Sequence, residues 1–343
     1  MKTVKEIYNF FLDSMNSERH QASLMDFLET VPEFKKKQDD GCSKMNMSLG
    51  MEYLKVCEQM CDDFLLIKVK PASAILIDAE YIAVYKTNST NPKAFIDEIE
   101  YGKYDFKYRG FQYIRNYFFY SVLPIVGKNR KTGNEDLGTS FYIGDNMFVT
   151  AAHCVKGLEN FNILMPNNSP LQLSEVWYVK EMSLDDYDLA IIRCTEAPKT
   201  LRAFKMKNPC VLDEVMTMGY PPIPGLNPVL ISETASVASY VNGRQKASIG
   251  QVAAEVGSYM STLDFFVITA RVKGGNSGSP VINRDGYVVG TVFQIPFDSH
   301  GGSDGGRYDI MGYGVCLPSK YITDLIIQHE THILKQCNGA YNE

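Results

Sequence analysis

The spacing of apolar residues changes along the chain from a helical to a strand-like period. Apolar side chains recur every three or four residues in three early segments, which predicts helices at 1–20, 24–37 and 45–64. After Pro71 apolar and polar positions alternate, which predicts strands at 75–77, 81–85 and 104–109. We therefore predict an α+β domain over residues 1–117.

From residue 118 onwards, short apolar runs are separated by turn residues, as is typical of antiparallel β structure. The strands predicted in this part are 138–144, 147–151, 161–165, 177–181, 189–194 and 213–221. Helical spacing returns at 320–329 and predicts a final helix. Its His329 and His332 are one residue too close together for a zinc-protease motif, and we expect both at the surface.

A serine set among glycines at 274–280 lies between the apolar runs 265–270 and 281–292. Glycines on both sides of a serine allow a tight turn that can aim two amide N–H groups at one point, as an oxyanion hole requires. Ser277 is therefore the candidate nucleophile. A serine needs an adjacent base and a carboxylate that orients the base.

Both partners occur upstream of the serine. His153, one of five histidines, follows an apolar segment that ends in small residues, and Asp188 directly precedes the apolar run 189–192. Taken alone, a histidine beside a cysteine is more often a packed core residue, and a glycine-flanked serine is often only a turn. Asp185 and Asp186 are competing carboxylates, which are most simply a solvated turn.

The order His, Asp, Ser, with the motifs Thr-Ala-Ala-His-Cys, Asp-Leu-Ala and Gly-Asn-Ser-Gly-Ser-Pro, resembles the chymotrypsin-like (trypsin-like) serine proteases over residues 118–337. The serine motif is most similar to the bacterial glutamyl endopeptidase and HtrA-like branch. The resemblance implies that His153 is the general base, Asp188 orients it and Ser277 attacks the substrate. The N–H groups of Gly275 and Ser277 would bind the oxyanion.

The fold implied by this resemblance is an all-β double antiparallel barrel. The first barrel is expected at about 118–210, the second at about 211–318 and a C-terminal helix at about 319–337, all within a protease domain spanning 118–343. His153 and Asp188 then belong to the first barrel and Ser277 to the second. Activation by cleavage before Ile125 is not expected, because the residue before the nucleophile is Asn276, which cannot neutralise a buried ammonium.

The substrate pocket carries no charge that identifies its preference. By resemblance its walls include Arg271, Val292, Phe293, Gln294 and Gly314. Such walls weakly favour an apolar or small side chain, although Arg271 would favour an acidic one if its head reached the pocket. We expect the loop 296–313 beside the pocket to be functional, because loops of this length are uncommon in compact domains.

The amino-acid composition limits the kinds of partner that the protein is expected to bind. A net charge of −6 argues against nucleic acid as the main ligand, and the apolar runs are too short to span a bilayer. The tyrosines between residues 101 and 120 suggest a base-stacking surface or, more simply, a half-buried sheet. The first segment is amphipathic rather than a signal peptide, so we expect a cytoplasmic protein.

The eight cysteines form no close metal-ligand spacing, and we expect no metal and no cofactor. Cys57 and Cys61 share a helical face and are expected in the core. In secreted relatives the cysteine after the catalytic histidine forms a disulfide with the preceding strand, but 138–144 contains no cysteine. Cys154 is thus expected to be a buried free thiol.

Together these observations predict an intracellular, bacterial serine endopeptidase that acts on proteins or peptides through an acyl-enzyme. The domain at 1–117 would regulate it or recruit a substrate or partner protein. The alternative is a degenerate protease whose cleft binds a peptide without cutting it, as a scaffold protein would.

Overall fold

The computed structural model describes residues 1–17, 20–37, 43–73, 77–84, 92–131, 133, 135–178, 188–221, 230–232, 235–236, 244–257, 263–294 and 313–330. Its internal contacts divide the chain into two compact units, Met1–Gly110 and Phe111–Glu343. The predicted domain boundary between residues 117 and 118 stays a prediction.

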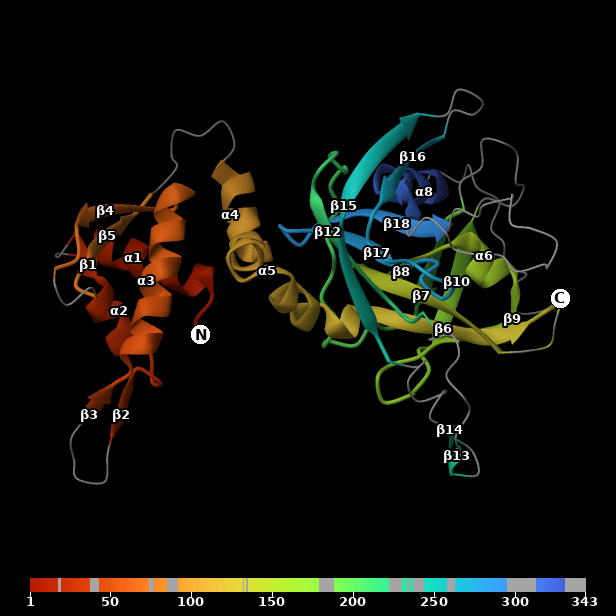
Figure 1. Ribbon diagram of the computed structural model, residues 1–343, viewed down its shortest axis with the longest axis horizontal. Helices are drawn as coiled ribbons and strands as arrows, with labels where there is room; N and C mark the ends of the chain where they lie inside the picture. Colours follow the sequence, from red (N-terminus) through yellow and green to blue (C-terminus); the bar gives the residue numbers. More distant parts are fainter. Residues whose placement is uncertain are drawn as a thin grey trace. The chain divides into compact units, whose positions relative to one another are not determined.

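The first unit combines helices with a small antiparallel sheet (Figure 1). Its elements are α1 (Val4–Asn16), β1 (Ala22–Ser23), α2 (Leu24–Glu29), β2 (Lys35–Lys37), β3 (Ser43–Met45), α3 (Met47–Asp62), β4 (Leu66–Lys70), β5 (Glu80–Ala83), α4 (Pro92–Tyr101) and the start of α5 (Lys103–Tyr117). Strands β1, β5 and β4 form one sheet in that order, and β2 pairs with β3 as a separate hairpin.

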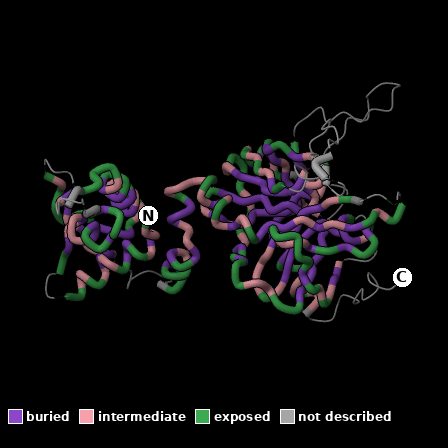
Figure 2. Tube along the Cα trace, turned by 90° about the horizontal axis from the view of Figure 1, so that it is seen from below, coloured by how far each residue is buried: buried purple, intermediate pink, exposed green. Residues whose placement is uncertain are grey.

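One apolar core holds this unit together. Helix α1 begins with a capping box between Thr3 and Glu6, and it buries Val4, Ile7, Tyr8 and Phe11 on one side. These side chains pack in a single cluster with buried residues of α2, α3 and the sheet, coloured purple in Figure 2. Cys57 is fully buried in this cluster and Cys61 packs against it, as the sequence predicts.

Two secondary-structure predictions in this unit are wrong. Residues 104–109 belong to helix α5, because the alternating pattern also fits contacts four residues apart: the rings of Tyr104 and Tyr108 pack together, and Arg109 pairs with Asp105. The tyrosines of this segment therefore lie on a helix and not on a sheet. The second predicted helix ends at Glu29, and its last three residues form β2.

The second unit begins with the end of α5 and the short helix η1 (Phe119–Ser121) and continues as β structure. Six antiparallel strands form its first sheet, in the order β10-β11-β8-β7-β6-β9. They are β6 (Val122–Asn129), β7 (Glu135–Gly144), β8 (Met147–Thr150), β9 (Leu158–Ile163), β10 (Leu173–Tyr178) and β11 (Ala190–Cys194), with helix α6 (Ala152–Lys156) after β8. The edge strands β9 and β10 approach through a bridge between Leu164 and Pro170, so the sheet is a nearly closed barrel.

The other six strands close into a second barrel, in the order β12-β15-β16-β19-β18-β17. They are β12 (Glu214–Gly219), β15 (Lys246–Gly257), β16 (Asp264–Ile268), β17 (Pro280–Asn283), β18 (Val288–Gln294) and β19 (Gly314–Pro318). A short hairpin, β13 (Leu230–Ser232) and β14 (Ala235–Ser236), lies between β12 and β15, and helix α8 (Lys320–Glu330) follows β19. The predicted double barrel with a C-terminal helix is confirmed.

Candidate active site

His153 and Asp188 are brought together by two neighbouring strands of the first barrel. Asp188 leads into β11, whose Ala190 pairs with Thr150 at the end of β8, and His153 lies three residues further, in α6. One carboxylate oxygen of Asp188 accepts the backbone N–H of His153 at 2.8 Å, and the other lies 2.5 Å from the ring Nδ1. The carboxylate thus orients the imidazole and leaves Nε2 as its outward-facing nitrogen.

The environment of His153 favours the protonated ring. Partial burial lowers the pKa of the imidazole, but the hydrogen bond to Asp188 and the neighbouring Cys154 outweigh burial and raise it to about 10. The direction of this shift is the one expected of an imidazole beside a carboxylate, which stabilises the imidazolium formed when the base accepts a proton. The ring keeps 46% of its side-chain surface exposed, so a substrate can reach it.

Ser277 is placed beside this pair by contacts of its own backbone. Its carbonyl accepts the N–H of Thr139 in β7 at 3.0 Å, and the Cys154 thiol lies 3.6 Å from the same oxygen. Cys154 directly follows His153 in the chain. The backbone of Ser277, in the second barrel, therefore lies close to the residue that follows His153 in the first barrel.

Gly278 lets the nucleophile turn lie directly against the first barrel. Its φ is +83°, and a side chain there would place Cβ 2.1 Å from the carbonyl oxygen of Thr139 and 2.4 Å from Oγ1 of Thr150. Only glycine fits such a conformation and such a close approach. This close contact is the physical reason why a glycine is needed beside Ser277.

Thr139, which sequence reasoning missed, connects the nucleophile turn to both barrels. Its hydroxyl donates to the carbonyl of Gly275 at 2.7 Å and accepts the N–H of Tyr220 at 3.1 Å. Tyr220 in turn donates its phenol to the carbonyl of Val122 at 2.9 Å. A single threonine in a strand carries no sequence signal for this role.

Two amide groups of the nucleophile turn are free to bind a ligand. The neighbouring N–H groups of Asn276, Gly278 and Ser279 donate to Lys273, Val292 and Asn276 respectively. By contrast, the N–H groups of Gly275 and Ser277 form no hydrogen bond within the described residues. These are the two donors expected to bind an oxyanion.

The predicted pocket residues fall into two groups. Val292 in β18 is 1% exposed and packs in the barrel core with Val272, and a Cβ on Gly314 would lie 2.6 Å from the Val272 side chain. Arg271 is exposed and its N–H donates to the Ser248 hydroxyl, whereas Phe293 is half-buried. The side chain of Gln294, and most of the predicted loop 296–313, lie outside the described residues.

Asn276 and Ile125 occupy positions that suit a chain assembled without cleavage. Asn276 is 3% exposed and accepts the hydroxyl of Ser279. Ile125 lies within β6, where it pairs with Gly138 on one side and Ile163 on the other. A neutral, hydrogen-bonded Asn276 needs no buried ammonium as its partner.

The prediction for His329 is wrong. Its ring stacks on Trp177 of β10 with centroids 4.1 Å apart, its Nε2 lies 3.2 Å from Glu175, and its side chain is only 13% exposed. The cause is the docking of α8 on the first barrel, which the sequence does not reveal. His332, Asp185 and Asp186 lie outside the described residues.

Neither a metal-binding cluster nor a membrane-spanning helix is found among the residues that the structure describes. No group of three or more His, Cys, Asp or Glu side chains in this part of the chain could hold a metal ion. Among the same residues, no helix is long and apolar enough to cross a bilayer.

The second unit has the double barrel of the chymotrypsin-like fold, with His153 and Asp188 paired in the first barrel and the glycine-flanked Ser277 in the second. The family model for the trypsin-like peptidase domain matches residues 138–290, so the chain contains a trypsin-like peptidase domain. No curated protein matches the sequence.

Solved structures of similar fold include two proteases. The active form of the Rv3671c protease from M. tuberculosis is 21% identical, with a TM-score of 0.49, and the match covers 66% of this chain and 87% of that chain. The HtrA-type protease AlgW with a tripeptide is 18% identical, with a TM-score of 0.45, and the match covers 64% of each chain.

Proposed function

We propose that this protein is a serine endopeptidase in which His153, Asp188 and Ser277 act as the catalytic triad. The observation that carries the proposal is the clamp on His153: one Asp188 carboxylate holds both its backbone and its ring nitrogen. An isolated structural histidine needs no such double contact. The position of Ser277 beside Cys154 supports the same assignment.

In this mechanism the Ser277 hydroxyl oxygen attacks the carbonyl carbon of a peptide bond while His153 accepts the hydroxyl proton. The oxyanion that forms is bound by the N–H groups of Gly275 and Ser277. The C–N bond then breaks as His153 gives its proton to the leaving amine, which yields an acyl-enzyme. Water, deprotonated by His153, releases the acid product and restores the serine.

The alternative function is peptide binding without cleavage. It predicts that the serine is not activated, whereas the proposed triad predicts that a fluorophosphonate labels Ser277 covalently. Ser277→Ala and His153→Ala should each abolish both labelling and proteolysis in a folded protein, and the double variant should be no worse than either, because the triad acts as a unit. Proteolysis that survives in either variant would remove the triad assignment.

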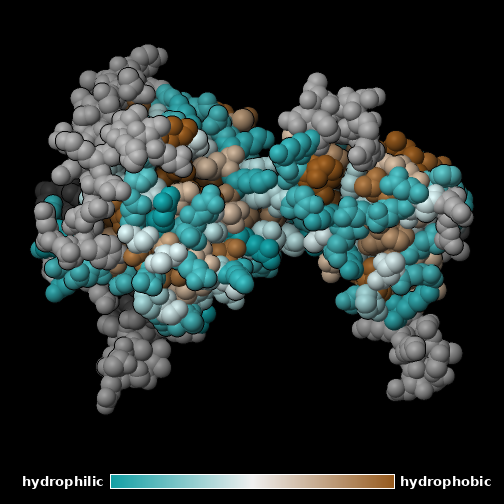
Figure 3. Space-filling model, turned by 180° about the vertical axis from the view of Figure 1, so that it is seen from behind, coloured by the Kyte–Doolittle hydropathy of each residue, from teal (hydrophilic) through white to brown (hydrophobic). Residues whose placement is uncertain are grey.

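We also propose that the first unit controls activity or recruits a partner protein. The exposed surface of helix α3 supports a protein partner over a nucleic acid, because it carries Glu52 and Met51 beside a single lysine, Lys55. Exposed apolar side chains of this unit include Phe64, Ile67 and Val69. Brown areas in Figure 3 mark hydrophobic residues on the surface in view. Apolar surface of this kind is common where proteins bind one another.

A cytoplasmic location is part of the same proposal. It is supported by Cys154, a buried thiol that faces Gly138 so closely that a Cβ there would lie 2.8 Å from its sulfur. Because glycine stands at this position, Cys154 has no cysteine partner on β7 and remains a free thiol. Reducing compartments keep such thiols free.

A further inference from the structure

The N–H of Ser277, one of the two candidate oxyanion donors, is oriented by bonds of the main chain. The carbonyl of Asn276 accepts the N–H of Ser279 at 2.8 Å, which fixes the peptide group that carries the Ser277 N–H. The next peptide group is fixed at both ends, because the Ser277 carbonyl accepts the N–H of Thr139 at 3.0 Å and the N–H of Gly278 donates to β18 at 2.7 Å. This donor therefore needs no side chain to hold it.

The other donor, the N–H of Gly275, depends on a side chain. Gly275 has no Cβ and a φ of +87°, so its own backbone restricts the direction of its N–H less than another residue would. The peptide group that follows is held by two bonds: its N–H, from Asn276, donates to Lys273 at 3.0 Å, and its carbonyl accepts the Thr139 hydroxyl at 2.7 Å. Of these two bonds, only the one from Thr139 connects the Gly275 donor to the first barrel.

The neighbours of the Thr139 hydroxyl set the direction of this bond. A hydroxyl has one hydrogen to donate and can also accept, whereas a backbone N–H can only donate and a carbonyl can only accept. The N–H of Tyr220 donates to the Thr139 oxygen at 3.1 Å, so the hydroxyl hydrogen is left for the Gly275 carbonyl. Thr139 is 0% exposed, and bulk water does not compete for either bond.

We propose that Thr139 is a positioning residue for the oxyanion site: its hydroxyl holds the Gly275 carbonyl and thereby keeps the Gly275 N–H aimed at the point where the oxyanion forms. The inference rests on the proposed function. Oxyanion donors are most effective when they are oriented before the reaction. Loss of the hydroxyl should therefore slow the formation of the acyl-enzyme and leave the binding of the substrate unchanged.

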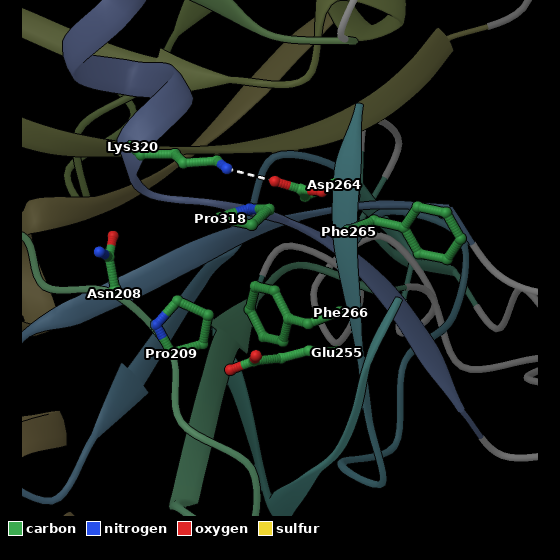
Figure 4. A pocket seen from close by; sticks show the side chains of 8 residues that line it. All are labelled: Asn208, Pro209, Glu255, Asp264, Phe265, Phe266, Pro318 and Lys320. Atoms are coloured by element: carbon green, nitrogen blue, oxygen red, sulfur yellow. Dashed lines mark hydrogen bonds and ion pairs between the residues drawn. The ribbon is translucent and has the colours of Figure 1, made fainter. Parts of the chain in front are cut away.

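The test compares two substitutions of Thr139 in the full-length protein. Thr139→Val keeps the shape of the side chain and removes the hydroxyl, and Thr139→Ser keeps the hydroxyl. Thr217→Val is the matched control, because Thr217 of the second barrel is 2% exposed and its hydroxyl has no hydrogen-bond partner in the described chain. A second control, Lys320→Gln, breaks the ion pair of Lys320 with Asp264, drawn as the dashed line in Figure 4, which includes no residue of the nucleophile turn.

Two probes follow the reaction without depending on the substrate preference. A fluorophosphonate reports the labelling rate of Ser277. The burst kinetics of p-nitrophenyl acetate, whose small acyl group makes little demand on the substrate pocket, report the acylation rate constant and the dissociation constant separately. Acylation is measured over a range of pH, and urea unfolding of each variant shows whether it is folded in the assay.

We expect Thr139→Val to slow acylation about 10- to 100-fold, less than the roughly 100- to 1,000-fold cost of removing an oxyanion donor, because the donor is displaced and not lost. The dissociation constant should change by less than about 2-fold. The pH midpoint of acylation should not move, because the contact between His153 and Asp188 is unchanged. Thr139→Ser should stay within about 3-fold of the parent, because its hydroxyl can form the same bond, and both controls within about 2-fold.

Two results obtained with a reactive parent protein would overturn this inference alone. One is a folded Thr139→Val protein that acylates at the rate of the parent. The other is a Thr139→Ser protein as slow as the valine variant, which would assign the effect to the shape of the side chain. Should the valine variant not fold, Thr139→Cys takes its place, because a thiol is a weak donor, and acylation as fast as that of the serine variant would contradict the role of the hydroxyl.

The failure of the proposed function gives a different result. A parent protein that the fluorophosphonate does not label would refute the activated serine, and this inference with it. A parent that is labelled, with a Thr139→Val variant that is labelled equally fast, would leave the triad in place and refute only the role of Thr139.

Discussion

Gly278→Ala is expected to be the most destabilising single methyl addition near the nucleophile. The new Cβ would lie 2.1 Å from the Thr139 carbonyl oxygen, 2.4 Å from Thr150 Oγ1 and 2.9 Å from the Ala151 nitrogen. Two of these atoms are backbone atoms of the first barrel, so no side-chain rotation relieves the contact. The turn and the barrel must move apart.

Two costs contribute to the expected loss of stability. A non-glycine residue at φ +83° costs about 1–2 kcal/mol, and overpacking a well-filled site costs typically about 1–3 kcal/mol. Their sum, about 2–5 kcal/mol, is a large part of the roughly 5–15 kcal/mol by which a domain is stable. With a urea m-value of about 2–3 kcal/mol/M, the unfolding midpoint should fall by about 1–2 M.

Trp177 provides the assay, because it is the only tryptophan of the chain and is fully buried in the second unit. Urea unfolding followed by its fluorescence reports on the barrels and not on the first unit. Gly274→Ala is the matched control: it lies in the same turn, has an ordinary φ and meets nothing within 4 Å. Its free energy of unfolding should stay within about 0.5 kcal/mol of the parent. A Gly278→Ala protein as stable as Gly274→Ala would refute the packing of the turn described above.

Three further outcomes are expected. Because the pKa of His153 is raised, the decline of kcat/KM on the acid side should be centred at a higher pH than for a free imidazole. Asp188→Asn should move this decline to lower pH and lower kcat by several orders of magnitude. A pH profile in which Asp188→Asn leaves the decline where it was would contradict the role of Asp188. Activity should survive dithiothreitol, because Cys154 and Cys194 are free thiols, and loss of folding under reduction would argue against this and against a cytoplasmic location. A fragment that begins at Phe111 keeps Phe118 stacked on Phe204 and should still react with a fluorophosphonate. It should differ from the full chain in its choice of protein substrate. An insoluble or unreactive fragment would mean that the first unit only braces the barrel.

The second unit was predictable because its strands and its motifs point to the same answer. Short apolar runs separated by turn residues specify antiparallel strands, and the strand order then brings Asp188 next to His153 through the β8–β11 pairing. The first unit was less predictable, because alternation over 104–109 satisfies a strand pattern and a helical pattern equally well. There the helical contacts prevail, since Asp105 also accepts the N–H of Val4, which stabilises the first turn of α1.

Residues that act through distant contacts had no signal in the sequence. His329 is placed by the docking of its helix on Trp177, which lies in a distant part of the sequence. Hydrophobic periodicity reports which face of an element is buried and not which element covers it. For this reason the chemistry of the motifs was predictable and the docking of α8 was not.

The contacts of Thr139 show why the candidate site depends on the two barrels together and not on its three side chains alone. The N–H of Thr139 donates to Ser277, its hydroxyl donates to Gly275, and its carbonyl accepts the hydroxyl of Thr150. The carbonyls of Gly275 and Ser277 are therefore held by the first barrel, and the N–H groups of the same two residues have no partner in the described chain. Oxyanion donors are most effective when they are already oriented before the reaction. A change that separates the barrels would thus weaken oxyanion binding even with His153, Asp188 and Ser277 intact.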